Sequence, residues 1–144
     1  MNAYADTGFV VSLYKLESTS ETAATMMKKL QAPVWISKLC EIELRNAFQL
    51  SVFRGEIDKH SAQLKLQLFQ QDLKKGIYAV MPVSSSAMHS KTAELIDRHS
   101  ARIGTRSLDL MHIAIALLLK ADVFLSFDLR QRKAAKLEGL KIKP

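Results

Sequence analysis

Short apolar segments alternate with longer stretches whose apolar residues recur at helical spacing, and this alternation constrains the fold more than any other feature of the chain. The first apolar segment, residues 2–5, is followed at once by a helical pattern, and the alternation continues to the C-terminus. Strands that alternate with helices form a mostly parallel sheet covered by helices on both faces. We therefore predict an α/β fold with three layers, α/β/α, in a single domain over residues 1–144.

The boundaries of these elements follow from capping residues, glycines and prolines. Ser18 and Glu21 have the spacing of a capping box, Ser37 and Ser107 each precede a helical pattern, and Gly104 follows one. The expected strands are residues 2–5, 34–36, 77–83, 123–127 and 140–142, and the expected helices are residues 8–14, 18–30, 38–53, 58–76, 84–102, 108–120 and 129–137. The side chains expected to face inward from two of these helices are Leu39, Ile42, Ala47, Phe48, Leu64, Leu68 and Phe69.

Four acidic residues stand out because they lie at the ends of apolar segments. Asp6 and Asp128 each follow an apolar strand, whereas Glu43 and Asp109 each lie in the first turns of a helix rich in apolar residues. The C-terminal edge of an open α/β sheet is where ligands bind. Carboxylates gathered there would repel one another by about 4 kcal/mol per pair at 4 Å and an effective dielectric near 20, which a Mg²⁺ or Mn²⁺ ion would offset. The plainer interpretation is that each acid only caps a helix N-terminus.

The neighbours of these four acids include hydroxyl, amide and imidazole groups that could support a site. Two hydroxyl residues flank the acids at the strand ends, and an amide and a histidine follow the two helical acids by three residues, on the same helix face. Each of them could instead satisfy local backbone groups or fill the core. The candidates for these supporting roles are Thr7, Asn46, His112 and Ser126.

Positive charge is concentrated in the second half of the chain. Residues 1–72 contain eight Lys or Arg and eight Asp or Glu, whereas residues 73–144 contain thirteen and six, which accounts for the net charge of +7. A localised basic surface suits a polyanion such as RNA, because neutralised phosphates release their counterions, although a merely solvated surface is equally compatible. The basic residues that we select as candidates for holding RNA phosphates are Arg102, Arg106, Arg130, Arg132 and Lys133.

Several other classes of protein find no support in the sequence. The single cysteine, Cys40, excludes an internal disulfide and a cysteine-based zinc site, and no histidine stands where it would activate this thiol. The scattered glycines form no phosphate-binding loop, and Gly8 stands where a phosphatase-like domain would carry a second aspartate. The longest apolar run, residues 113–119, is too short to span a membrane, and Asp6 argues against a signal peptide, so we expect a cytoplasmic protein.

Four segments of the chain together resemble the motifs of PIN-domain ribonucleases, in order and in spacing, and more narrowly those of VapC toxins from type II toxin–antitoxin systems. The resemblance covers essentially the whole chain. It implies a PIN-like fold and an Mg²⁺- or Mn²⁺-dependent endoribonuclease, with Asp6, Glu43, Asp109 and Asp128 as the catalytic, metal-binding carboxylates. The segments are Tyr4-Ala5-Asp6-Thr7, Glu43-Leu44-Arg45-Asn46-Ala47, Ser107-Leu108-Asp109-Leu110-Met111-His112-Ile113-Ala114 and Phe124-Leu125-Ser126-Phe127-Asp128-Leu129-Arg130.

The resemblance carries further expectations about partners and about two positions. It implies an RNA substrate, a cognate antitoxin that covers the groove, and a homodimer. Glu41 is a register alternative to Glu43, which we prefer because the residues after it match the family pattern. Family members often carry a further acidic or amide residue soon after the last aspartate, where this chain has Arg130, Gln131 and Arg132. The alternative function is a PIN-like module that binds RNA or protein without cutting.

Overall fold

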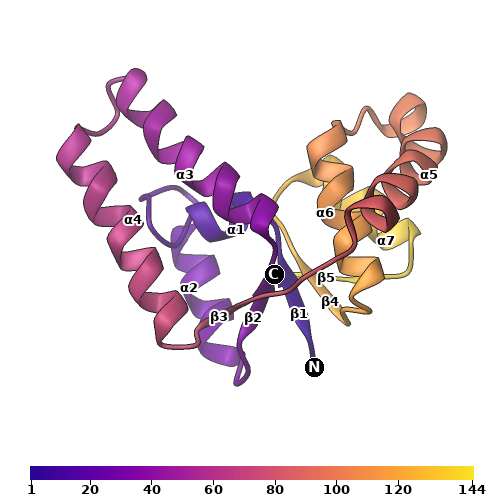
Figure 1. Ribbon diagram of the computed structural model, residues 1–144, viewed down its shortest axis with the longest axis horizontal. Helices are drawn as coiled ribbons and strands as arrows, with labels where there is room; N and C mark the ends of the chain where they lie inside the picture. The colour runs from indigo at the N-terminus through magenta and orange to yellow at the C-terminus, as the bar shows by residue number, and fades with distance from the viewer.

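The computed structural model, which describes residues 1–144, contains one sheet of five short strands with helices on both faces (Figure 1). The strand order is β3-β2-β1-β4-β5, so β1 lies at the centre, and every neighbouring pair is parallel. The predicted α/β class with three layers is therefore confirmed. The strands are β1 (Ala3–Ala5), β2 (Val34–Ile36), β3 (Tyr78–Val80), β4 (Val123–Leu125) and β5 (Lys141–Lys143).

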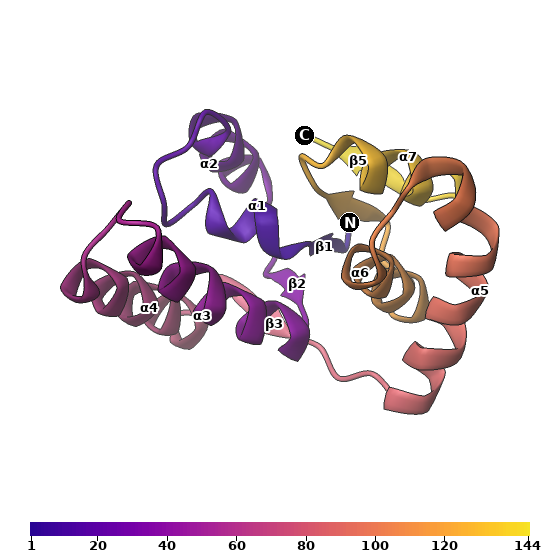
Figure 2. The same ribbon diagram turned by 90° about the horizontal axis from the view of Figure 1, so that it is seen from above.

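Two groups of helices lie on opposite sides of this sheet, as Figures 1 and 2 both show. Helices α1 to α4 pack on one face and α5 to α7 on the other. None of the seven is both long enough and apolar enough to cross a membrane. The helices are α1 (Thr7–Val11), α2 (Ser20–Lys29), α3 (Lys38–Phe53), α4 (Lys59–Lys74), α5 (Ser85–Ile103), α6 (Ser107–Leu118) and α7 (Leu129–Leu137).

Successive residues of the central strands feed two separate hydrophobic cores. In β1, Ala3 and Ala5 pack with α1 to α4, whereas Tyr4 packs with α5 to α7. In β4, Leu125 likewise packs with α1 to α4, and Phe124 packs with α5 to α7. Side chains alternate between the two faces of a strand. Each strand of a sheet that is covered on both faces is therefore apolar at every position, and this uninterrupted apolar pattern made the strands recognisable in the sequence.

The chain reverses its direction of travel across the sheet between β1 and β4. From β1 it proceeds to β2 and β3 on one side, and it then crosses to β4 and β5 on the other. Connections that leave two adjacent strands in opposite directions open a crevice beyond their carboxyl ends. Asp6 follows β1 directly, and its backbone N–H donates to the carbonyl of Leu125, the last residue of β4, at 3.1 Å. The fold thus places the ends of β1 and β4 side by side at this crevice.

Two predicted helix caps are wrong. The N-cap of α2 is Thr19 without a side-chain hydrogen bond, and Ser20 Oγ instead accepts from the backbone N–H of Glu17, so no capping box forms. The N-cap of α6 is Arg106, and Ser107 is already the first helical residue. The predicted cap at Ser37 is confirmed, because its Oγ accepts from Cys40 N. Local sequence alone could not separate these cases, since each serine precedes a helical pattern.

The predicted inward-facing stripes on α3 and α4 are partly wrong. Ile42 is 67% exposed, Leu64 46% and Leu68 53%. The two helices instead bury narrow stripes that contain Phe48 and Phe69, together with Cys40, Leu44, Ser51 and Ala62. The two helices pack against each other, and α3 also packs on α1 and α4 on β3, so only a narrow face of each reaches the core. The third and fourth strands are also shorter than predicted, ending at Val80 and Leu125.

Candidate active site

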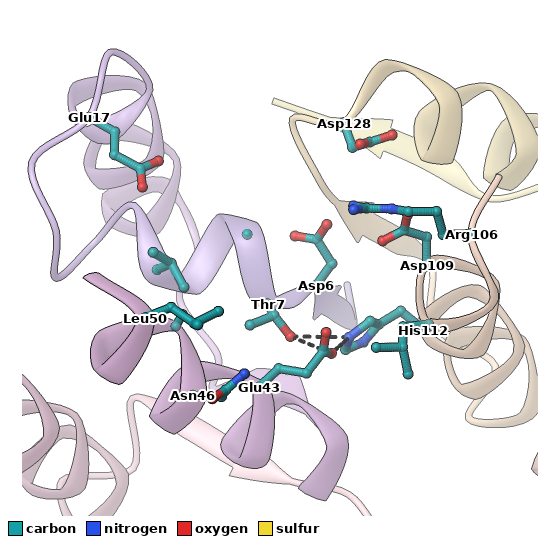
Figure 3. Close-up of a pocket in the computed structure, with 14 residues that line it drawn as sticks. Asp6, Thr7, Glu17, Glu43, Asn46, Leu50, Arg106, Asp109, His112 and Asp128 are labelled. Carbon is teal, nitrogen blue, oxygen red and sulfur yellow. Dashed lines mark hydrogen bonds and ion pairs between the residues drawn. The ribbon is translucent and has the colours of Figure 1, made fainter. Parts of the chain in front are cut away.

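A pocket of about 400 Å³ opens between α1 and α3 on one side and α6 and α7 on the other. Figure 3 shows its lining side chains, which come from both helical groups and from the end of the central strand. All four selected acids contribute to it: Asp6 after β1, Glu43 on α3, Asp109 on α6 and Asp128 before α7. Glu41 is not among the lining residues. The structure therefore brings together four acids that are up to 122 positions apart in the sequence.

Asp6 is the most deeply buried of the four acids, with 6% of its surface exposed. Its Oδ1 accepts from the backbone N–H of Phe9 at 2.8 Å and so caps α1, and its Oδ2 accepts from the hydroxyl of Ser126 at 3.1 Å. Burial raises the pKa of Asp6 to about 6, because desolvation outweighs the lowering by His112 and by these hydrogen bonds. Asp6 is thus a desolvated acid at the floor of the pocket.

Asp128 caps α7, because its Oδ1 accepts from the backbone N–H of Gln131 at 2.8 Å. Gln131 is fully buried and links two elements of the site: its Nε2 donates to the Asp109 carbonyl at 3.0 Å, and its Oε1 accepts from Ser126 at 2.7 Å. The single hydroxyl hydrogen of Ser126 serves either Gln131 or Asp6, not both at once. The helix-capping interpretation therefore holds for Asp6 and Asp128, and it does not conflict with their position in the pocket.

Glu43 is held by hydrogen bonds from two buried side chains. The Nε2 of His112 donates to Glu43 Oε1 at 2.5 Å, and the hydroxyl of Thr7 donates to the same oxygen at 2.9 Å. Behind His112, its Nδ1 lies 2.7 Å from the hydroxyl of Tyr4, which donates to Ser37 Oγ at 2.9 Å. Although burial alone would raise the pKa of Glu43, the hydrogen bond and charge of His112 lower it overall. This chain fixes Glu43 in its ionised form.

Asp109 faces the pocket while paired with Arg106, its neighbour on the first turn of α6. The guanidinium Nε donates to Asp109 Oδ2 at 3.0 Å, and the hydrogen bond and charge of Asp109 raise the pKa of Arg106. The Arg106 side chain is 80% exposed, so it can leave this partner at little cost in packing. Arg106 is the one arginine or lysine that lines the acidic pocket.

The donor set of the pocket fits a hard divalent cation, since carboxylate oxygens are the ligands that Mg²⁺ and Mn²⁺ prefer. A Cβ atom at Gly8 would lie 3.8 Å from both carboxylate oxygens of Asp6, so the glycine leaves that carboxylate open to the pocket. No three acidic, histidine or cysteine side chains stand close enough together to hold one ion in this arrangement. Asp109 Oδ2 accepts from Arg106 Nε, so an ion bound through this oxygen would have to displace the guanidinium group.

The remaining candidates divide between pocket and surroundings. Thr7, His112 and Asn46 line the pocket, and Ser126 is buried beneath it. Among the basic candidates, Arg132 is half-buried and its Nη1 donates to the Ser126 carbonyl at 2.7 Å, so it holds the loop after β4. Arg102 and Lys133 are exposed and line neither this pocket nor its neighbour, in which Arg130 takes part.

Two functional features were missed in the sequence. Glu17 is a further acid at the outer side of the pocket (Figure 3), and it was not among the candidate residues selected from the sequence. Gln131 is the second, because only tertiary structure shows its contacts with Ser126 and Asp109. The position of Cys40 agrees with its exclusion as a nucleophile, since the residue is fully buried and burial raises the pKa of its thiol.

Comparison with known proteins adds family information to this geometry. A family model described as the PIN domain matches residues 3–137. No curated protein sequence matches the chain significantly.

Among solved structures, FitAcB from Neisseria gonorrhoeae is similar at 15% identity and a TM-score of 0.68, with 99% of this chain and 96% of that chain covered. VapBC2 from Rickettsia felis, bound to a DNA fragment from its promoter, is similar at 16% identity and a TM-score of 0.71, with 99% and 98% covered. VapC20 from Mycobacterium tuberculosis, described as a sarcin–ricin-loop-cleaving toxin, is similar at 16% identity and a TM-score of 0.71, with 99% of this chain and 100% of that chain covered. At these identities the likeness concerns the fold.

Proposed function

Since the chain belongs to the PIN-domain family, we propose that it is an Mg²⁺- or Mn²⁺-dependent endoribonuclease, the VapC-like toxin of a type II toxin–antitoxin system. The observation that carries this proposal is that Asp6, Glu43, Asp109 and Asp128 all line one pocket. Such a concentration of hard oxygen donors at the switch point of a parallel sheet suits metal-assisted hydrolysis of a phosphodiester.

Each acid has a proposed role that follows from its surroundings. Asp6 and Asp109 would hold the ion directly, whereas Glu43 and Asp128 would hold a second ion or the waters of the first. When bound, the ion supplies Lewis acidity that activates water and stabilises the negative charge developing on the phosphoryl oxygens. Glu43 stays ionised because His112 and Thr7 donate to it, so it can orient a water molecule through its second oxygen.

Protein partners and location form part of the same proposal. The similarity to VapBC2 and to FitAcB supports a cognate antitoxin as partner, and the pocket has an apolar rim of Val11, Leu50 and Leu108 that an antitoxin segment could contact. We further propose a homodimer that acts on RNA in the cytoplasm. VapC20 is described as cleaving the sarcin–ricin loop, so structured ribosomal RNA is a substrate class to test.

The competing proposal is a PIN-like module that binds RNA or protein without cutting. Two observations favour it: no three acids, histidines or cysteines are grouped closely enough to hold one ion, and Arg106 is hydrogen-bonded to Asp109. The two proposals differ in what Arg106 does. In a nuclease Arg106 would release Asp109 when the metal ion binds, whereas in a binding module the salt bridge between Arg106 and Asp109 would persist.

Cleavage of total RNA by the purified protein, in Mg²⁺, Mn²⁺ or EDTA, tests the proposal against this competitor. We expect discrete fragments that require the metal ion, and we expect Asp109→Asn to abolish them while the protein stays folded. Glu94→Gln, a change on an exposed face of α5, serves as the matched control and should cleave like the natural chain. RNA that binds but remains intact under all conditions would support the binding module instead.

A further inference from the structure

A second pocket, of about 500 Å³, adjoins the acidic pocket and shares Arg106, Asp109 and Asp128 with it. Its other lining residues come from the loop before α6 and from the first turn of α7, and they include Thr105 and Arg130. We propose that this pocket binds a phosphate group of the RNA backbone next to the phosphate that is cleaved. The inference rests on the proposed ribonuclease function and names one of its substrate subsites.

Thr105 provides the first argument for a ligand. Its Oγ1 is the only buried side-chain nitrogen or oxygen atom in the protein without a hydrogen-bond partner, and the residue is 8% exposed. Leaving a buried hydroxyl unpaired destabilises the folded protein, so such groups are rare and usually have a partner that is absent from the isolated chain. Thr105 lines the second pocket. Its Oγ1 has no exposed surface in the isolated chain, so a phosphate oxygen would accept its hydrogen after the side chain turns toward the pocket.

The N-terminus of α6 provides the second argument. This helix has 12 residues, its N-cap is Arg106, and no side chain caps it. The backbone N–H groups of its first turn, at Ser107, Leu108 and Asp109, have no acceptor within the protein. Unpaired N–H groups together with the helix dipole favour an anion at this end. An unpaired hydroxyl and an uncapped helix therefore meet beside the same pocket.

Two guanidinium groups complete the site. Arg106 and Arg130 both line the pocket, and Arg130 Nη1 donates to the Gly104 carbonyl through a long bond of 3.4 Å. A Cβ at Gly104, where φ is 74°, would lie 3.4 Å from this nitrogen, so glycine lets the guanidinium rest against the loop. Asp109 and Asp128 oppose an anion, and the phosphate is bound most tightly once a cation neutralises these acids.

Binding of a short, fluorescently labelled single-stranded RNA tests the subsite, measured by anisotropy across a salt series in Ca²⁺ and in EDTA. Thr105→Val replaces the hydroxyl with a methyl group and so removes one hydrogen bond to a charged phosphate. We therefore expect RNA binding to weaken about tenfold, while the salt dependence of binding stays unchanged. Arg130→Gln should weaken binding and reduce the slope of log K against log salt by about 0.7, the value for one phosphate on a single strand. Thr22→Val and Arg54→Gln, both exposed and outside the two pockets, are the matched controls.

Thermal unfolding separates binding from folding in the same variants. Thr105→Val should unfold at the same temperature as the natural chain or higher, because it removes an unpaired buried hydroxyl. A lower unfolding temperature would assign the hydroxyl a structural role and overturn the proposal. If the natural chain binds and cleaves RNA and both variants bind it equally well, the subsite is wrong while the ribonuclease stands. If the natural chain neither binds nor cleaves RNA, the proposed function fails and the subsite fails with it.

Discussion

Asp6 combines two roles that usually fall to different residues. It caps α1 through Phe9 N, and it presents a desolvated carboxylate to the pocket, where burial raises its pKa to about 6. Ionising it near neutral pH therefore costs folding free energy that the protein would recover only with a cation nearby.

Asp6→Asn should change how stability depends on pH. The pKa of Asp6 is raised from about 3.8 in the unfolded chain to about 6 in the folded protein. The folded state therefore holds the proton more tightly, and its stability falls as pH rises between these values. Relative to Asp6→Asn, the natural chain should lose about 2 kcal/mol of unfolding free energy between pH 4 and pH 8 in EDTA. Denaturant unfolding of both proteins at both pH values measures this difference. The expectation would be contradicted if the unfolding free energies of the natural chain and of Asp6→Asn changed equally with pH.

The hydroxyl of Tyr4 should matter for activity as well as for stability. Tyr4→Phe leaves the Nδ1 of His112 without its buried partner, which should lower the unfolding free energy by about 1–3 kcal/mol. It should also slow RNA cleavage, because the imidazole that donates to Glu43 is held less firmly. Tyr14→Phe is a matched control, since its hydroxyl also has two partners, Asp72 and Tyr78, but lies away from the pocket. Equal losses of cleavage rate in both variants would mean that Tyr4 acts through stability alone.

The acids of the site could be predicted because their positions are local features of the sequence. Asp6 and Asp128 follow apolar runs, and Glu43 and Asp109 begin apolar helices. The pairing partners could not be predicted in the same way. The contacts of Gln131, like the unpaired hydroxyl of Thr105 and the chain from His112 to Tyr4, depend on which elements pack together.

At the scale of elements, the end of α7 is joined to α5 by a cluster of charged side chains. Glu138, the C-cap of α7, accepts from Arg98 at 2.7 and 3.1 Å and from His99 at 2.6 Å. Although burial would raise the pKa of Glu138, its hydrogen bonds with Arg98 and His99 lower it overall. His99 is itself buried, so this contact anchors the two helices that flank α6.

Glu138→Gln should therefore loosen the helices on this face of the sheet. A carboxyl group whose pKa is lowered by folding stabilises the protein above its unfolded pKa, and the contribution is lost as pH falls through the folded pKa. We expect a loss of about 1–3 kcal/mol at pH 7 that shrinks once the pH falls below the ordinary pKa of a glutamate and is gone when the pH has fallen through the lower pKa that Glu138 has in the folded protein. Glu94→Gln removes only an exposed pair with Lys91 and should cost under about 1 kcal/mol. Urea unfolding of both variants checks this, and a loss independent of pH would rule out the ionic contact.

Element boundaries were more predictable than element faces. Gly104 ends α5 in a left-handed conformation, and Ser37 and Asp58 cap α3 and α4, because these functions depend on residues next to one another in the chain. Which face of α3 or α4 reaches the core depends on the angle at which the helix meets the sheet. For that reason the exposed positions of Ile42 and Leu64 could not be inferred from periodicity.

At the scale of the whole molecule, the pocket joins two groups of helices that otherwise meet through the sheet (Figure 2). Glu43 comes from the group of α1 to α4, whereas Asp109 and Asp128 belong to the group of α5 to α7. The proposed ion, held by acids of both groups, would connect them in addition to the sheet. Ligands that bind only the folded state stabilise it by mass action.

Saturating Mn²⁺ should accordingly stabilise the protein against unfolding. At an ion concentration about 100 times the dissociation constant, the gain is about 2.7 kcal/mol, which corresponds to roughly 5–10 °C for a chain of this size. Differential scanning calorimetry of the natural chain and of Asp109→Asn, each in Mn²⁺ and in EDTA, measures the shift. The same shift in both proteins would place the ion elsewhere.

The central claim is that carboxylates of the pocket enable water to cleave an RNA phosphodiester with the help of a divalent ion. Cleavage of a defined RNA in water enriched in ¹⁸O, followed by mass spectrometry of the products, tests this claim most directly. We predict a terminal phosphomonoester that carries one ¹⁸O atom, formed in Mn²⁺ and absent in EDTA or with Asp6→Asn. A 2′,3′-cyclic phosphate without ¹⁸O, formed equally well in EDTA, would show that the ribose hydroxyl attacks without the metal and would contradict the account.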